Sequence, residues 1–287
     1  MLVNNSFNLA VTYFNAGQLV EARKQCEKVL KKYPANADVL GLLGTILSRI
    51  GNLNSAIRTY QTGLSVAPAR LDIRDALATC LLSVGQVDKA ISQWLHILNM
   101  RPDLVSIRYN LAQAFMLNGC ADDAIKQFES IVTIDPSPIN LSNLASGLFT
   151  LERKEEAVEF YQKALACNPH NAITHRDLAT TWRDLGEAEK ADAEYRLAIS
   201  LGNSWGHRVE NATLLPIVYD SVEQIDQWRK RLINEIEELR ASPIRLNNPY
   251  VDCQYSDFYF AYQALNNRDI KSSAAEMFKK ACPRLEL

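Results

Sequence analysis

Small apolar residues recur at fixed intervals along the first two thirds of the chain, separated by larger apolar residues and polar ones. They form two columns with a step of 33 or 34 residues, and the columns lie twelve residues apart. The first column is Ala10, Gly44, Ala78, Ala112, Ala145 and Ala179, and the second is Ala22, Ala56, Ala90, Ala124, Ala157 and Ala191. Because two antiparallel helices approach closely only where their facing side chains are small, this pattern predicts a series of tight helical hairpins.

Glycine and proline mark the ends of the predicted helices. Glycine lies between the two columns at Gly17, Gly51, Gly85, Gly119 and Gly186, and proline follows the second helix at Pro34, Pro68, Pro102, Pro136 and Pro169. Glycine allows the backbone to leave the first helix and reverse, whereas proline cannot continue the second helix. Glu152 replaces the glycine of the fifth repeat, and Asn203 replaces the proline of the sixth, where we expect the array to end.

Large side chains occupy the remaining positions and are predicted to fill the core. They are Tyr13, Leu47, Leu81, Phe115, Leu148 and Trp182 on the first helices and Tyr60, Trp94, Phe128, Tyr161 and Tyr195 on the second. Together with the small residues, glycines and prolines, they resemble the tetratricopeptide repeat (TPR). The resemblance covers six repeats, at 3–36, 37–70, 71–104, 105–137, 138–171 and 172–205. It implies an all-α, right-handed superhelical solenoid with a helical C-terminal extension.

The first helices of such a solenoid line its concave side, so their groove-facing side chains are candidate binding residues. The sixth position of the repeats reads Asn8, Leu42, Ala76, Asn110, Asn143 and Asp177. An Asn side chain offers a donor and an acceptor, which match one peptide unit of any sequence. We expect Tyr109, Gln113, Met116, Arg176, Thr180 and Arg183 to complete a peptide-binding groove. The alternative explanation of these amides is the solvation of an exposed helix face.

A different pattern begins after Trp205, which divides the chain into a predicted solenoid, 1–205, and a helical cap or stem, 206–287. Ser221 and Gln224 form a capping box at the start of an amphipathic helix. Its apolar residues up to Pro243 are Val222, Ile225, Trp228, Leu232, Ile236 and Leu239. Residues 241–256 indicate a connector, and two short helices are predicted after it, the second ending near Pro283.

Three segments of this region resemble the stretch that joins repeats to catalytic lobes in bacterial SPINDLY-type, O-GlcNAc transferase-like proteins. They are LLPIVY at 214–219, DSVEQIDQWRKRL at 220–232 and FYFAYQALNNRDI at 258–270. The third matches the pattern FYLAYQGxNDR of these proteins at Phe258, Tyr259, Ala261, Tyr262, Gln263, Asn266 and Arg268 and departs from it at Ala264 and Asn267. The resemblance implies the substrate-recognition part of a glycosyltransferase whose two catalytic lobes are not in this chain.

Composition and charge exclude several classes of function. Of the 287 residues 47% are hydrophobic, which is ample for an extended core, and the formal charge of −2 gives no overall attraction for nucleic acid. We find neither a signal peptide nor about 18 consecutive apolar residues, so we expect a cytoplasmic protein without membrane contact. The six cysteines lie far apart without a CxxC pair, which is typical of reduced thiols.

No combination of residues predicts catalysis or metal binding. Cys167, His170 and His175 have the spacing C-x2-H-x4-H, but a fourth ligand is not near them in the sequence. His96 and His207 have no Cys or Ser partner that spacing reveals, and the chain has neither a Walker loop nor GxGxxG. We therefore expect no catalytic residue, metal or cofactor in this chain.

Three functions remain open at this point. The first is a scaffold that binds partner or substrate polypeptides in its groove, as the recognition part of a glycosyltransferase-like protein. The second is a stand-alone assembly scaffold in which 206–287 forms a polar cap for the last repeat. The third is a UDP-sugar-dependent protein O-glycosyltransferase, if the natural polypeptide continues beyond Leu287. Solenoids of this type also dimerise through their convex faces, so a homodimer is among the partners considered.

Overall fold

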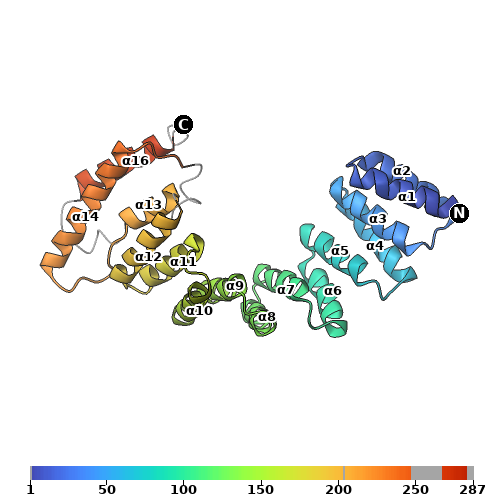
Figure 1. Ribbon diagram of the computed structural model, residues 1–287, viewed down its shortest axis with the longest axis horizontal. Coiled ribbons are helices and arrows are strands. Elements are labelled where there is room, and N and C mark those ends of the chain that lie inside the picture. Colours follow the sequence, from blue (N-terminus) through green and yellow to red (C-terminus); the bar gives the residue numbers. More distant parts are fainter. Residues whose placement is uncertain (1, 203, 247–266, 283–287) are drawn as a thin grey trace. The chain divides into compact units, whose positions relative to one another are not determined.

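The computed structural model describes residues 2–202, 204–246 and 267–282, and these residues form helices and connecting turns without a strand (Figure 1). Six consecutive hairpins pair α1 (Leu2–Asn15) with α2 (Leu19–Lys32), α3 (Ala37–Arg49) with α4 (Leu53–Val66), α5 (Leu71–Ser83) with α6 (Val87–Met100), α7 (Val105–Leu117) with α8 (Ala121–Ile134), α9 (Pro138–Thr150) with α10 (Lys154–Cys167), and α11 (Ala172–Asp184) with α12 (Ala188–Leu201). They are followed by α13 (Trp205–Ala212), α14 (Val222–Ala241) and α16 (Arg268–Ala281). The predicted all-α array of helical hairpins is confirmed.

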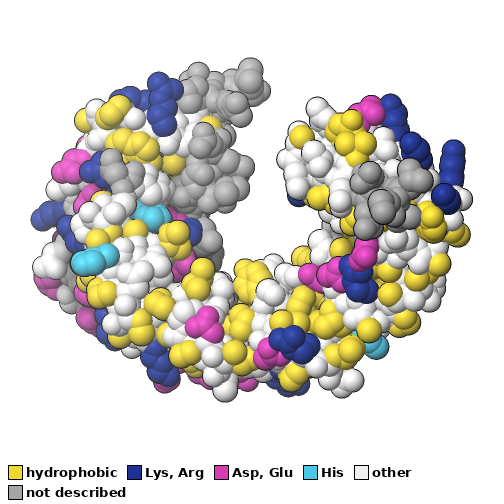
Figure 2. Space-filling model, turned by 45° about the vertical axis from the view of Figure 1, so that its right-hand side comes forward, with side chains coloured by type: hydrophobic (Ala, Val, Ile, Leu, Met, Phe, Trp, Pro, Cys, Tyr) yellow, Lys and Arg dark blue, Asp and Glu magenta, His cyan; other side chains and the backbone are white. Residues whose placement is uncertain are grey.

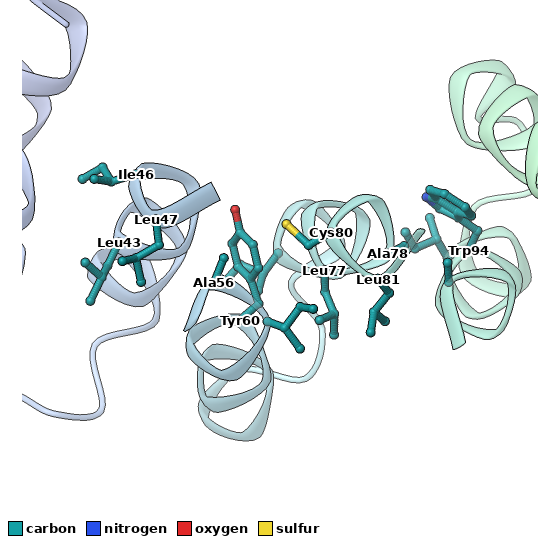
Figure 3. Close-up of a cluster of buried hydrophobic side chains, with 14 of the residues drawn as sticks. Leu43, Ile46, Leu47, Ala56, Tyr60, Leu77, Ala78, Cys80, Leu81 and Trp94 are labelled. Carbon is teal, nitrogen blue, oxygen red and sulfur yellow. The ribbon is translucent and has the colours of Figure 1, made fainter. Parts of the chain in front are cut away.

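The chain divides into two compact units, residues 1–135 and 136–287. The first unit contains four hairpins, and residues of α1 to α7 form one apolar core; Figure 3 shows Tyr60 and Ala56 of α4 within it, near Leu77 of α5. In the second unit a core that includes Tyr195, Trp228 and Leu232 joins the last hairpin to the C-terminal helices. This division falls inside the predicted solenoid, and the separation of 1–205 from 206–287 stays a prediction.

The small columns lie where the helices of each hairpin meet. All eleven alanines of the two columns have an exposed fraction of 0%, and Gly44 is buried as well. A Cβ atom added to Gly44 would lie 2.4 Å from Cε1 of Tyr60, so only glycine fits between these two helices. The predicted role of the small residues in close helix packing is confirmed.

The first helix of each hairpin ends in the same hydrogen-bonded turn. After α3, the Gly51 amide donates to the Ser48 carbonyl at 2.9 Å and the Asn52 amide to the Leu47 carbonyl at 2.9 Å. These two bonds make a Schellman motif, which requires a left-handed residue between them. Gly17, Gly51, Gly85, Gly119 and Gly186 have φ angles from 73° to 87°, and Glu152 has φ 58°. Glu152 therefore keeps the turn in spite of its side chain.

Three of the large residues predicted to lie in the core are only partly buried. Tyr13, Phe115 and Trp182 pack against the core clusters but keep part of their rings exposed. A large aromatic ring at this position reaches the edge of the hairpin, and the ring of Trp182 is covered there by the Lys190 ammonium group at 4.4 Å. The smaller Leu47, Leu81 and Leu148 at the same position are fully buried, as predicted.

The C-terminal helices follow the predicted pattern with two differences. The Ser221 hydroxyl accepts the Gln224 amide at 3.1 Å at the start of α14, as the capping box predicts, and α16 ends at Ala281. Val222 was wrongly assigned to the apolar face, because it precedes the part of α14 that meets the core and is 70% exposed. The short helix α13 was not predicted. The matches at Phe258 to Asn266 lie outside the described residues.

Candidate functional site

Four of the predicted groove residues lie together on α7 in the first unit. Tyr109 packs its ring edge against Phe128 of α8, with centroids 6.2 Å apart, and remains 36% exposed. Asn110 and Met116 are half-buried, and Gln113 is exposed. One helix therefore presents an aromatic ring, two amides and a thioether at its surface, a mixture suited to both the backbone and the side chains of a peptide.

The amides of Asn8, Asn110 and Asn143 share one property. None of the three side chains has a hydrogen-bond partner within the part of the chain that the structure describes. Asn8 is exposed on α1, whereas Asn110 on α7 and Asn143 on α9 are half-buried. The donor and acceptor groups of these amides can therefore bond to water or to a ligand. This holds for each of the two units considered by itself.

The predicted residues on α11 are instead bonded inside the second unit. Arg176 donates to both carboxylate oxygens of Glu210 at 3.2 and 3.1 Å, and the Glu210 side chain is completely buried. Thr180 is buried and shares a 3.0 Å hydrogen bond with the Tyr195 hydroxyl. Arg183 donates to Asp184 at 3.0 Å. Arg176 and Thr180 therefore join α11 to α13 and α12, whereas this bond of Arg183 lies within α11. All three offer a ligand less than the residues of α7 do.

Asp177, at the sixth position of the sixth repeat, lies beside this network. We call the residues at the sixth position of the repeats the ladder residues; they are Asn8, Leu42, Ala76, Asn110, Asn143 and Asp177. Burial raises the pKa of its carboxyl to about 6, Arg176 at 3.5 Å opposes the shift, and the negative charge of Glu210 adds to it. A protonated carboxyl group has one donor and one acceptor, as an amide has. Asp177 therefore resembles the ladder asparagines most closely in mildly acid solution.

A second recurrent feature was missed in the sequence. The fourth residue of three repeats bonds a side chain 19 positions later and a proline carbonyl six positions earlier. The sets are Arg74 with Gln93 and Pro68 at 2.7 and 3.0 Å, Arg108 with Gln127 and Pro102 at 2.8 and 3.0 Å, and His175 with Glu194 and Pro169 at 2.6 and 2.9 Å. The signal was present as a basic residue paired with Gln or Glu at one fixed spacing. We call these three sets the loop clamps.

The loop clamp of the sixth repeat also explains the histidine considered as a metal ligand. His175 is buried, Nδ1 lies 2.6 Å from Glu194, and Nε2 lies 2.9 Å from the Pro169 carbonyl. Both ring nitrogens are therefore occupied by protein oxygens. Among the thiols, burial raises the pKa of Cys26 to about 12, so this thiol stays protonated at neutral pH.

Charged side chains of both signs are spread over the face shown in Figure 2. Many form ion pairs, such as Arg70 with Asp72 at 2.7 Å and Arg101 with Asp103 at 2.8 Å. Exposed pairs of this kind contribute little to stability, but they leave no large field of one sign. No helix among the described residues is long and apolar enough to span a membrane.

Models of a known protein family match the part of the chain that forms the hairpins. Models of the tetratricopeptide repeat match residues 13–78, 76–137 and 141–168. No curated protein matches the chain. These matches cover much of the six hairpins and carry the repeat assignment that the sequence pattern predicts.

Solved structures resemble the chain over most of its length. A TPR protein from Parabacteroides merdae is 16% identical with a TM-score of 0.61, over 96% of this chain and 98% of that one. The C-terminal part of a TPR protein from Cytophaga hutchinsonii is 16% identical with a TM-score of 0.63, over 96% of this chain and 93% of that one. YrrB, described as a TPR protein with an unusual peptide-binding site, is 14% identical with a TM-score of 0.52, over 62% of this chain and 92% of that one. At these identities the likeness concerns the fold.

Proposed function

Since the chain belongs to the tetratricopeptide-repeat proteins, we propose that it is a stand-alone scaffold that binds extended segments of partner proteins along the first helices of its repeats. Repeats of this kind present the first helices of neighbouring hairpins side by side within each unit, which suits an extended polypeptide. YrrB, which shares the fold, is described as having a peptide-binding site. The proposal concerns binding alone and assigns no reaction to the chain.

The unpartnered amides of Asn110 and Asn143 carry the proposal. A peptide backbone needs one donor and one acceptor for each unit, and each of these amides offers both without breaking a bond to another described residue. Around Asn110, the exposed parts of Tyr109 and Gln113 supply contacts for the side chains of the peptide. Affinity would therefore come from the backbone of the partner, and specificity from the neighbouring side chains.

Substitution of the ladder amides tests this proposal. A binder is first selected from an array of immobilised 12-residue peptides of random sequence, and its affinity for the chain is then measured by fluorescence anisotropy. We expect Asn110→Ala and Asn143→Ala each to weaken binding about tenfold, which corresponds to about 1.4 kcal/mol for the loss of a paired amide. Circular dichroism should remain unchanged, because neither amide has a bond within the described residues.

The matched control is Asn99→Ala on the second helix α6, where the side chain is exposed and lies outside the proposed site. It should leave the affinity unchanged. Equal affinities of Asn110→Ala, Asn143→Ala and the control would show that these amides are solvated helix surface and do not bind the peptide.

The finer hypothesis of a glycosyltransferase stem rests on the three C-terminal sequence segments alone. The family models and structures described above add no support to it. Its test is the reading frame downstream of Leu287 in the natural gene: two α/β lobes there would favour the stem, and a stop codon would favour the stand-alone scaffold. The homodimer also stays a prediction, which sedimentation equilibrium would check.

A further inference from the structure

A polar cleft of about 390 Å³ lies between α12, α13 and α14 in the second unit. Its lining comes from α12 (Arg196, Ile199, Ser200), α13 (Arg208, Asn211) and α14 with the residue after it (Glu235, Glu238, Leu239, Ser242). None of the residues predicted from the sequence to bind a peptide lines this cleft. Its volume falls in the range of ligand-binding clefts, about 300 to 1,000 Å³.

The cleft contains one cation and one anion whose charges are not neutralised by a neighbour. The guanidinium of Arg208 stacks over the Trp205 ring at 5.1 Å, and no carboxylate within the described residues pairs with it. The exposed carboxylate of Glu238 likewise has no ion-pair or hydrogen-bond partner there. By contrast, Arg196 on the same lining is bound to Asp192 at 2.8 Å and lies 3.9 Å from Glu235.

Part of the lining is fixed by internal bonds. Asn211 donates to Asp192 at 2.9 Å, and its carbonyl oxygen accepts a 2.9 Å bond from Arg231. Leu239 is only 5% exposed and, with the half-buried Ile199, adds an apolar area to the lining. A preformed cleft of this kind would bind a ligand without a large cost for ordering its own side chains.

We propose that this cleft binds a second, short segment of a partner protein that carries an acidic, an apolar and a basic side chain. The acidic side chain pairs with Arg208, the basic one with Glu238, and the apolar one packs on Ile199 and Leu239. The lining carries two glutamates, Glu235 and Glu238, as well as two arginines, so it has no excess of positive charge that would favour a phosphate group. The chemistry therefore favours a peptide of mixed charge.

Trp205 provides a reporter for this binding because its ring lies against Arg208. The probe is the peptide acetyl-Asp-Gly-Leu-Gly-Lys-amide, whose three side chains lie on one face of an extended chain. It is titrated into the ¹⁵N-labelled full chain, and the indole N–H resonance of Trp205, assigned with Trp205→Phe, is followed. We expect a saturable shift, with affinity reduced at least fivefold in Arg208→Gln and in Glu238→Gln.

Three controls decide the outcome. Arg245→Gln removes an exposed arginine outside the cleft and should leave the affinity unchanged. The neutral probe acetyl-Asn-Gly-Leu-Gly-Gln-amide should bind at least fivefold more weakly. Asn110→Ala should not affect this titration, so failure here and failure of the ladder proposal are distinguishable. Absence of a saturable shift, equal binding of the neutral probe, or equal binding of free leucine would overturn the proposal.

Discussion

The turn that closes each hairpin depends on one residue in the left-handed region, and in the fifth hairpin this residue is Glu152 with φ 58°. A side chain in this conformation costs about 1 kcal/mol, and part of that cost remains after the greater chain entropy of glycine is counted. We therefore expect Glu152→Gly to raise the free energy of unfolding by about 0.5 to 1 kcal/mol in urea titrations. The lost contact with Lys154 at 2.6 Å involves a carboxylate that is 78% exposed, so it offsets little of this gain.

Gly51→Ala provides the opposite test of the same turn. Gly51 has φ 87° and open space around the position of an added Cβ, so the substitution changes backbone strain without a clash. It should lower the free energy of unfolding by about 1 kcal/mol. A stabilising Gly51→Ala, or a destabilising Glu152→Gly, would contradict the assignment of backbone strain to this position.

Asp177 makes the stability of the chain depend on pH. Burial raises its pKa from 3.8 to about 6, so between these values the folded chain keeps a proton that the unfolded chain has released. Its contribution to the free energy of unfolding therefore falls as pH rises through this window. Asp177→Asn should be more stable than the wild type at pH 7 by roughly 1 to 3 kcal/mol, and the difference should shrink towards pH 3.5.

Urea titrations at both pH values measure this effect. Asn143→Ala is the control, because it removes no titratable group and should differ from the wild type by the same amount at each pH. A constant difference between Asp177→Asn and the wild type would show that the carboxyl is not perturbed by folding.

At the residue scale, the repeat pattern predicted which positions share a face but not which side chains are free. The 34-residue step placed Asn110 and Asp177 at equivalent positions, and helix packing puts both on first helices. Asp177 differs because it is largely buried and lies 3.5 Å from Arg176, which in turn binds Glu210 beyond the last predicted repeat. A pattern of local spacing could not reveal this partner, because α13 itself does not match the repeat.

At the scale of elements, the loop clamps fix how the first helix meets the loop before it and the second helix after it. Arg108 donates to the Pro102 carbonyl in the loop before the fourth repeat and to the Gln127 side chain on the second helix of this repeat. In the fifth repeat the equivalent positions are Leu141, which is buried, and Phe160. The polar pair of the fourth repeat is therefore replaced by two apolar residues in the fifth.

A double-mutant cycle tests this exchange. Arg108→Leu and Gln127→Phe should each lower the free energy of unfolding by about 1 to 2 kcal/mol, because each leaves a polar partner without its bond. The double variant carries the residues of the fifth repeat and should recover at least 0.5 kcal/mol relative to the sum of the two. Strict additivity in urea titrations would mean that the two side chains do not act as a pair.

The sequence predicted the helices and their turns well, since the hairpins follow local rules for small residues, glycine and proline, apart from Glu152 in the fifth repeat and Asn203 in the sixth. It did not predict α13, whose eight residues end early and are followed by an irregular stretch up to Ser221. The packing of α14 on α16, and the bond from the Leu246 amide to the Ala281 carbonyl at 2.9 Å, depend on contacts between distant segments. Spacing within one helix carries no information about such contacts.

At the scale of the whole molecule, each unit has its own apolar core, which predicts that part of the chain folds alone. The core of the first unit includes Ala10, Tyr60, Ile73, Trp94 and Leu111, all from residues 1–135. In repeat proteins each hairpin is stabilised by its neighbours, and three or more are generally needed. A fragment of residues 1–135 has four hairpins and should keep the helicity expected from its sequence and unfold cooperatively in urea.

A shorter fragment, residues 1–66, separates core packing from intrinsic helix propensity. It has two hairpins and lacks Ile73, which is 1% exposed in the whole chain and lies beside the backbone of Gly41 and Gly63. Without this side chain and the rest of α5, the surface of α3 and α4 is left in water, so we expect little helix and no cooperative transition. If residues 1–66 fold as stably as residues 1–135, local helix propensity holds these hairpins together. If residues 1–135 stay unfolded, their core requires contacts from the rest of the chain.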